Sequence, residues 1–126
     1  MPDCDPIGRV RTPFADTDDA PRQGLHEDAD GEILLDDGYE PGLTGFEPGD
    51  DVLVVWFADQ ADRSVIRVRD GERGVFTTRS PERPNPICLT VCEITAVEDG
   101  RLSVRGVDMV DGSPVLDLKV PIEGRN

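Results

Sequence analysis

Histidine, lysine and aromatic residues are scarce in this 126-residue sequence, which has one histidine, one lysine, one tryptophan and 5% aromatic residues. A serine–histidine–aspartate triad would have to use His26, and its neighbours Glu27 and Asp28 indicate an exposed loop. With one histidine, three cysteines and no Cys-x-x-Cys pair, a zinc site is not expected. We therefore expect no metal centre and no hydrolase of the triad type.

Long apolar runs are also missing. No stretch approaches the roughly 18 residues of a membrane span. The N-terminus, Met-Pro-Asp-Cys-Asp-Pro, has neither the basic nor the apolar region of a signal peptide. On one strand, Cys88 and Cys92 would lie about 13 Å apart on the same face, too far for a disulfide. These features predict reduced thiols, no membrane partner and a cytoplasmic location.

Positive charge is the third shortage. There are 27 acidic and 13 basic residues, giving a net charge of −14. Eighteen of the acids are Asp and twelve of the bases are Arg. This Asp-rich, Lys-poor composition is typical of proteins in very high salt, where the Debye length falls to about 3 Å at 1 M. The alternative is a functional acidic surface for a basic partner.

The charge is distributed unevenly along the chain. Residues 1–62 carry 3 basic and 17 acidic residues, a net of −14, and residues 84–126 carry a net of −3. Residues 63–83 carry six arginines against three acids, a net of +3. An arginine side chain can bind phosphate or carboxylate through two hydrogen bonds. This basic segment either meets an anionic ligand or pairs with the protein's own acids.

The local patterns predict a mainly β protein. Five Asp-Gly pairs mark tight turns, and Asp99-Gly100 separates two alternating apolar runs, as in a hairpin. Val52 to Phe57 is continuously apolar, as in a strand buried on both faces. No window of a dozen residues keeps a helical period. We expect one compact antiparallel barrel or sandwich over residues 1–126 with short loops, and strands at 7–11, 32–35, 51–57, 65–69, 75–77, 87–97, 101–108 and 115–119.

Two segments contain unusual polar residues. In Gly74–Ile87, three prolines stiffen a loop that carries Arg79, Arg83 and Asn85, as suits either a preorganised binding site or a rigid crossover. In Gly106–Lys119, three carboxylates are not readily explained by salt adaptation: Asp108, Asp111 and Asp117. Asp117 and Lys119 would lie on one face of the last strand and form a polar pair.

Four blocks of sequence together resemble the TsaA-like (TrmO) family: Ile7-Gly8-Arg-Val-Arg-Thr-Pro13-Phe14, Pro21-Arg22-Gln23, Gly74-Val-Phe-Thr-Thr-Arg79-Ser-Pro-Glu-Arg83-Pro-Asn85-Pro-Ile87 and Asp108-Met-Val-Asp111-Gly112-Ser-Pro114-Val-Leu-Asp117-Leu-Lys119. The resemblance runs in order from residue 6 to 122. It implies a β-barrel methyltransferase that uses S-adenosylmethionine. Characterised members methylate N6 of threonylcarbamoyladenosine beside the anticodon of certain tRNAs, as homodimers. Consistent with a non-Rossmann cofactor site, the chain has no Gly-x-Gly-x-x-Gly motif.

The resemblance also implies cofactor contacts, which fall on Gln23, Gly24, Leu25, Ala58, Asp59, Arg79, Leu89, Arg105, Gly106, Val107 and Asp108. This sequence departs from the family pattern at Asp59, where members often have histidine, and at Cys88, where glycine is usual. It also has Val120-Pro121 where Pro-Tyr is common, and a short loop over residues 59–74.

Methyl transfer is an in-line displacement, so the site must mainly align the two reactants and exclude water. A carboxylate can take the proton that N6 loses; Asp108 is the first candidate and Asp117 the second. Arg79, Arg83, Asn85 and Lys119 are the candidate substrate ligands. Two alternatives stay open: a methyltransferase for a small molecule or another nucleoside, and a non-catalytic S-adenosylmethionine-binding barrel.

Overall fold

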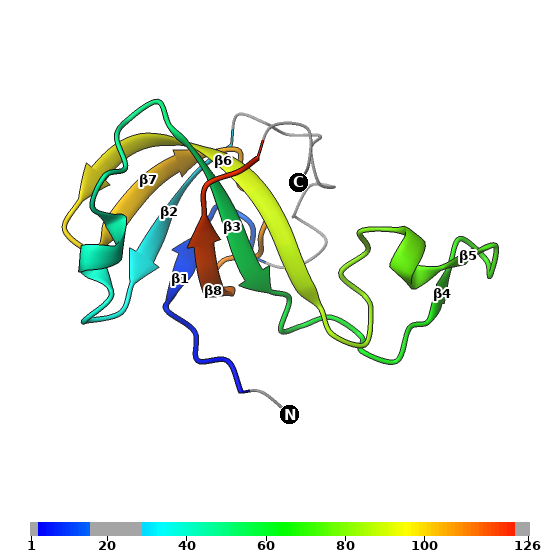
Figure 1. Ribbon diagram of the computed structural model, residues 1–126. Helices are drawn as coiled ribbons and strands as arrows, with labels where there is room; N and C mark the ends of the chain where they lie inside the picture. The colour runs from blue at the N-terminus through cyan, green and yellow to red at the C-terminus, as the bar shows by residue number, and fades with distance from the viewer. Residues whose placement is uncertain (1–2, 16–28, 123–126) are drawn as a thin grey trace.

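A closed antiparallel β-barrel forms the body of the protein (Figure 1), as the computed structural model shows for residues 3–15 and 29–122. The strand order around the barrel is β1-β2-β7-β6-β3-β8. The mainly β, antiparallel architecture predicted from the turn signals is thereby confirmed. The barrel strands are β1 (Gly8–Arg11), β2 (Asp30–Leu35), β3 (Asp51–Phe57), β6 (Ile87–Glu98), β7 (Arg101–Arg105) and β8 (Pro114–Lys119).

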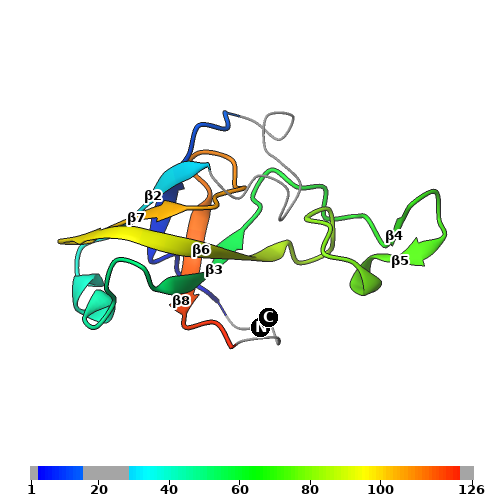
Figure 2. The same ribbon diagram turned by 90° about the horizontal axis from the view of Figure 1, so that it is seen from above.

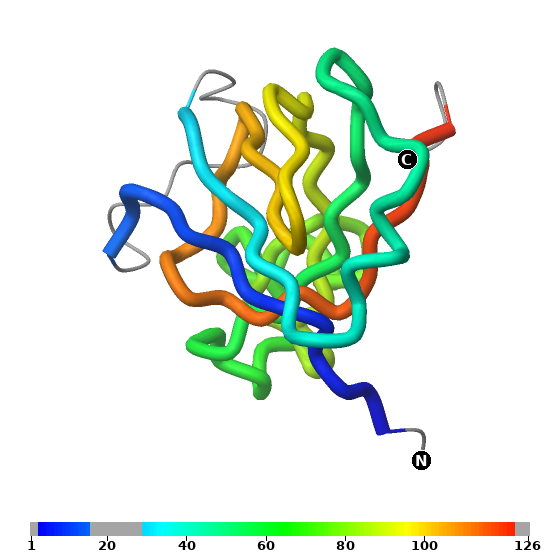
Figure 3. The backbone as a smooth tube through the Cα atoms, turned by 90° about the vertical axis from the view of Figure 1, so that its left-hand side faces the viewer, coloured from blue at the N-terminus to red at the C-terminus, as the bar shows by residue number. Residues whose placement is uncertain are grey.

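The longest strand, β6, joins the two halves of the barrel. It pairs with β3 from Ile87 to Glu93 and with β7 from Glu93 to Glu98, with a register shift between Ile94 and Ala96. The predicted hairpin at Asp99-Gly100 connects β6 to β7, and Gly100 takes the positive φ of +67° that such a turn requires. Figure 3 shows these strands from the side opposite to the segment that follows β3.

The barrel interior is filled by aliphatic side chains that alternate with outward residues along each strand. The positions with 2% exposure or less include Val10, Ile33, Val52, Val54, Ile94, Leu102, Val104, Val107, Met109 and Val115. Burial of this set against water is the main favourable term in folding. It also fixes the rigid wall from which the site is built.

A long excursion, residues 58–86, leaves the barrel between β3 and β6, and we call it the arm (Figures 1 and 2). It contains β4 (Arg67–Val68), β5 (Arg73–Gly74) and the 3₁₀ helix η2 (Val75–Thr77). At its base, the Arg63 side chain donates to Pro84 O at 2.8 Å and to Asn85 Oδ1 at 3.1 Å. The guanidinium also lies over the Phe57 ring, 5.7 Å from its centroid.

Three strand predictions are wrong. The predicted strand at 65–69 is a two-residue strand with Ile66 55% exposed, because the arm offers no sheet against which an alternating face could pack. The predicted strand at 75–77 is η2. The strand predicted to reach residue 108 ends at Arg105, because Gly106 takes a φ of +100°. The 3₁₀ helix η1 (Glu40–Leu43) is an element that the sequence patterns did not indicate.

The described residues include no helix that is long and apolar enough to cross a membrane. They also include no group of three or more His, Cys, Asp and Glu side chains arranged to hold a metal ion. The three cysteines are all free, with Cys92 buried, Cys88 half-buried and Cys4 exposed.

Candidate functional site

A cavity of about 670 Å³ lies where the two ends of the arm meet the barrel. This volume is typical of sites that enclose a small-molecule ligand. Strand β3 contributes Trp56, β6 contributes Ile87, Cys88 and Leu89, and the loop between β7 and β8 contributes Asp108. The full lining is Trp56, Ala58, Asp59, Gln60, Ala61, Arg79, Ser80, Pro81, Glu82, Arg83, Ile87, Cys88, Leu89, Asp108, Val110 and Ser113.

The Asp108 carboxyl is fixed by a chain of two hydrogen bonds from the barrel. Trp56 Nε1 donates to Thr90 Oγ1 at 3.0 Å, and Thr90 Oγ1 donates to Asp108 Oδ1 at 2.6 Å. Trp56 and Thr90 are only 8% and 5% exposed. Burial raises the pKa of Asp108, and the Thr90 hydrogen bond opposes that rise because it stabilises the charged form. The cavity therefore holds one oriented carboxyl that binds a proton more tightly than an exposed aspartate does.

Cys88 lines the cavity beside this carboxyl. Burial raises the pKa of its thiol to about 11, the Asp108 charge adds to the rise and Arg83 opposes it. At neutral pH the side chain is therefore a thiol, which is a weak nucleophile. At this position the thiol forms part of the cavity wall.

The proline-rich loop is stiffened by its own polar side chains as well as by its prolines. Arg83 Nη2 donates to Val75 O at 2.7 Å and to Thr78 O at 3.0 Å. Thr78 Oγ1 donates to Val75 O at 2.8 Å, and Asn85 Oδ1 accepts from Arg63. These bonds give the structural basis for a preorganised loop. They also show that Arg83 and Asn85, expected as substrate ligands, make hydrogen bonds within the arm.

Apart from residues 105–107, most of the cofactor contacts that the resemblance implies line the cavity. The predicted residues in its lining are Ala58, Asp59, Arg79, Arg83, Leu89 and Asp108. They come from the two ends of the arm, from β6 and from the loop between β7 and β8. The predicted residues Gln23, Gly24 and Leu25, together with His26, lie outside the described residues.

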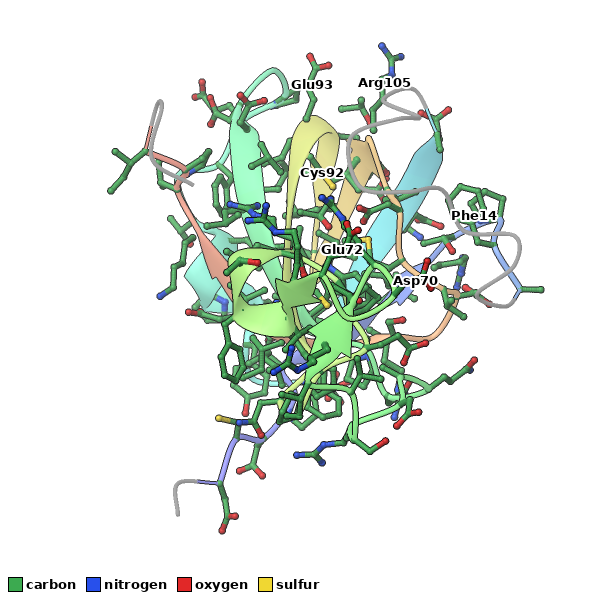
Figure 4. The ribbon with its side chains drawn as sticks, turned by 90° about the vertical axis from the view of Figure 1, so that its right-hand side faces the viewer. Phe14, Asp70, Glu72, Cys92, Glu93 and Arg105 are labelled. Carbon is green, nitrogen blue, oxygen red and sulfur yellow. The ribbon has the colours of Figure 1, made fainter. Side chains whose placement is uncertain are left out.

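Other predicted residues lie away from the cavity lining. Arg105 lies 3.8 Å from Asp30 in an ion pair and extends outward from the barrel in Figure 4. Val107 is fully buried in the core, where it helps to fix the segment that leads to Asp108.

Gly106 and Asn85 also lie outside the cavity lining. The Gly106 N–H donates to Ala29 O at 2.8 Å. Asp117 forms the predicted polar pair with Lys119, with their charged atoms 2.7 Å apart, and neither of these two side chains lines the cavity.

Sequence reasoning missed Trp56 and Thr90. Both were visible only as members of apolar strand patterns, and a buried threonine in a strand has an ordinary structural explanation. The strand register supplies the missing signal, because Trp56 pairs with Cys88 and Val54 with Thr90 across β3 and β6. The pairing places the indole and the hydroxyl on the same face of the sheet.

Comparison with protein families gives a match to tRNA-methyltransferase O, N-terminal domain, over residues 9–123. A probable S-adenosyl-L-methionine-binding protein of Halobacterium salinarum is 55% identical over 120 residues, covering 94% of this chain and 97% of that protein. An S-adenosyl-L-methionine-binding protein of Archaeoglobus fulgidus is 51% identical over 118 residues, covering 90% of this chain and 85% of that protein.

A mouse tRNA (adenine(37)-N6)-methyltransferase is 53% identical over a shorter segment of 53 residues, which is 42% of this chain and 12% of that protein. The crystal structure of TrmO from Pseudomonas aeruginosa superposes with a TM-score of 0.81 at 34% identity. The superposition covers 97% of this chain and 56% of the TrmO chain. This chain therefore spans little more than half the length of that solved structure.

Proposed function

Because this chain belongs to the tRNA-methyltransferase O N-terminal domain family, we propose that it transfers a methyl group from S-adenosylmethionine to N6 of threonylcarbamoyladenosine beside a tRNA anticodon. The observation that carries the proposal is the oriented Asp108 carboxyl in a cavity of about 670 Å³. The names of the archaeal relatives support the cofactor, and the name of the mouse relative supports a tRNA adenine as acceptor. A tRNA substrate implies a cytoplasmic location.

The residues of the cavity fit S-adenosylmethionine. Trp56, Leu89 and Val110 provide apolar surface for the adenine ring, and Arg79 provides a cation for the carboxylate of the methionine end. The Asp108 carboxylate provides an anion for a positively charged ligand. When bound, the cofactor supplies a methyl group on a positively charged sulfur. The proline-rich loop, already ordered, holds Arg79 in place without further loss of chain entropy.

Asp108 is the proton acceptor in this proposal. The lone pair of N6 is delocalised into the base and the carbamoyl group, so N6 must lose its proton to become an effective nucleophile. A carboxylate whose pKa is raised by burial is a stronger base than an exposed one. We assign Asp117 no proton transfer, because it is paired with Lys119 and lies outside the cavity lining.

We further propose that the chain acts as a homodimer, supported by an apolar outer face on the barrel. Val55 and Phe57, both half-buried, alternate with the buried Val54 and Trp56 of β3 and so face outward. Their cross-strand partners on β6 are Leu89 and Ile87, which also line the cavity, and Val91 follows on the same face and is 42% exposed. An apolar patch on the outside of a barrel is a typical protein–protein interface.

The dimer proposal predicts that Val91→Lys shifts the protein to a monomer in sedimentation experiments, because a charge would be buried at the interface. Tyr39→Lys is the matched control, because Tyr39 is 43% exposed and Val91 42% exposed. Tyr39 directly precedes η1 and belongs to neither β3 nor β6, so this variant should keep the wild-type mass. A dimeric Val91→Lys protein would exclude this face as the interface.

Nucleoside mass spectrometry of tRNA from a strain that lacks the gene tests the acceptor. We expect N6-methylated threonylcarbamoyladenosine to disappear, and to return with the wild-type gene but not with Asp108→Asn. An unchanged profile would exclude this acceptor. Calorimetry tests the cofactor separately: if the protein binds no S-adenosylmethionine, the whole proposal fails, and if Arg79→Ala keeps the affinity within about twofold, the role of Arg79 is wrong.

A further inference from the structure

The outer part of the arm carries an apolar side chain that the cavity does not use. Phe76, in η2, is 77% exposed, the highest value among the large hydrophobic residues that the structure describes. It does not belong to the cavity lining. An aromatic ring this exposed on a projecting segment is a candidate contact for a partner.

Basic side chains accompany this ring. Arg67, Arg69 and Arg73 lie on β4, β5 and the turn between them. Arg67 donates to Gly71 O at 3.4 Å, and Arg73 donates to Thr77 Oγ1 at 3.0 Å. Both therefore bind neutral oxygens of the arm.

The described residues show no ion pair between these three arginines and a carboxylate. The ion pairs there involve Arg11, Arg101, Arg105 and Lys119 instead. The arm also carries Asp70 and Glu72, which Figure 4 shows on the arm in front of the barrel. The segment from residue 63 to 83 nevertheless keeps a net charge of +3 within a protein of net charge −14. The arm therefore offers cationic side chains to an outside anion.

The exposed ring and the basic side chains continue directly from the cavity. The two ends of the arm, residues 58–61 and 79–83, form one wall of the cavity. Phe76 is three residues before Arg79, so the two Cα atoms are at most about 11 Å apart. A nucleotide that enters the cavity would therefore have its neighbours in the chain beside the arm, which projects from the barrel in Figures 1 and 2.

We propose that the outer arm, residues 66–76, is the RNA-contact surface, with Phe76 stacked on an unpaired base next to the modified nucleotide and Arg67, Arg69 and Arg73 on phosphates. This inference rests on the proposed tRNA acceptor. Single-stranded RNA loops are recognised mainly by stacking on aromatic side chains and by arginine contacts. Stacking does not depend on counterion release, so it keeps its strength in high salt, where phosphate contacts weaken.

The test measures the affinity of a fluorescent anticodon stem-loop RNA for the protein, by polarisation in about 1 M KCl, where screening is strong. We expect Phe76→Ala and Phe76→Leu to raise the Kd by about 5- to 100-fold, as loss of one stacked base does elsewhere. Phe76→Trp keeps the aromatic plane and should stay near the wild-type value. Calorimetry should show unchanged S-adenosylmethionine affinity in all three variants, which separates RNA binding from cofactor binding.

Each of the following outcomes would overturn the inference. If Phe76→Leu binds RNA like the wild type, the ring is not stacked on a base. If Phe76→Ala lowers the sedimentation mass, the ring contacts a second copy of the chain instead. If the wild type methylates tRNA and Phe76→Ala keeps its Kd, only the arm assignment fails. If the wild type neither binds nor methylates tRNA, the acceptor proposal fails with it.

Discussion

In the proposed reaction, the Asp108 carboxylate accepts the proton that N6 loses. We expect Asp108→Asn to lower kcat for methyl transfer by about 10²- to 10⁴-fold, as loss of a general base does in other enzymes. The amide oxygen of asparagine can still accept the hydrogen bond from Thr90, so the fold should be retained. The measurement is kcat with tRNA and S-adenosylmethionine. A variant with wild-type kcat would show that the proton leaves by another route.

Thermal unfolding provides the matching control for this variant. Because burial raises the pKa of Asp108 in the folded state, the folded protein binds more protons than the unfolded chain between the two pKa values. The free energy of unfolding therefore falls as the pH rises through that window. The Asp108→Asn variant lacks this pH-dependent loss of stability. At pH values above the window, the melting temperature of the variant should therefore equal or exceed that of the wild type. A clear loss of stability there would mean that reduced kcat reflects misfolding.

Thr90 is a positioning residue in this account, because it acts on Asp108 and lies outside the cavity lining. Thr90→Val removes the hydrogen bond that holds the pKa of Asp108 down, so that pKa should rise further. The base is active when deprotonated, so the acidic limb of the kcat/KM profile should move to higher pH. Thr90→Ser should restore the wild-type profile. An unmoved limb would show that Asp108 does not set it.

These residues also show which parts of the site could be predicted. Arg79 and Asp108 could be predicted because they lie in sequence motifs, and both line the cavity. Trp56 and Thr90 lie in apolar strands, and only the register of β3 and β6 reveals their hydrogen bond. Motif reasoning also selected Asp117 and Arg105, whose ion pairs lie away from the cavity lining.

Among the elements, the barrel strands followed from sequence more closely than the arm. β3 and the β6–β7 hairpin were predictable because buried faces and turn residues determine them locally. Residues 65–69 alternate in the same way, yet Ile66 is 55% exposed. An alternating pattern predicts a buried face only where another layer covers it, and the described residues place no second sheet layer against the arm.

The pairing of β1 with β2 depends on a glycine at the close approach of two backbones. A Cβ on Gly8 would lie 2.1 Å from Leu34 O, which is far inside van der Waals contact. Gly8→Ala should therefore destabilise the protein by about 1–3 kcal/mol, because the strands must separate. Urea unfolding of Gly74→Ala is the control, since Gly74 has a φ of −67° and open space around it. Equal midpoints for the two variants would refute this reading of β1.

For the whole molecule, the net charge of −14 describes its relation to the solvent. The acids outnumber the bases two to one, so most carboxylates repel one another at low ionic strength. We expect the melting temperature to rise steadily between about 0.1 and 2 M KCl, because screening weakens this repulsion. The double variant Asp36→Asn with Asp37→Asn, at two exposed positions, should show a smaller rise. A melting temperature independent of salt would contradict the halophilic interpretation.

Across the whole molecule, the basic segment of the sequence coincides with the part of the fold that borders the cavity. The acidic N-terminal half supplies much of the barrel, while the basic segment forms most of the arm at the edge of the cavity. The overall acidity is therefore compatible with a local RNA surface in which stacking contributes much of the affinity.

The most direct test of methyl transfer to tRNA uses labelled S-adenosylmethionine and bulk tRNA in molar KCl, followed by nucleoside mass spectrometry. The account predicts label in N6-methylated threonylcarbamoyladenosine with the wild-type protein, and almost none with Asp108→Asn. If the folded protein binds S-adenosylmethionine but leaves the tRNA unlabelled, the proposed methyl transfer to tRNA is contradicted.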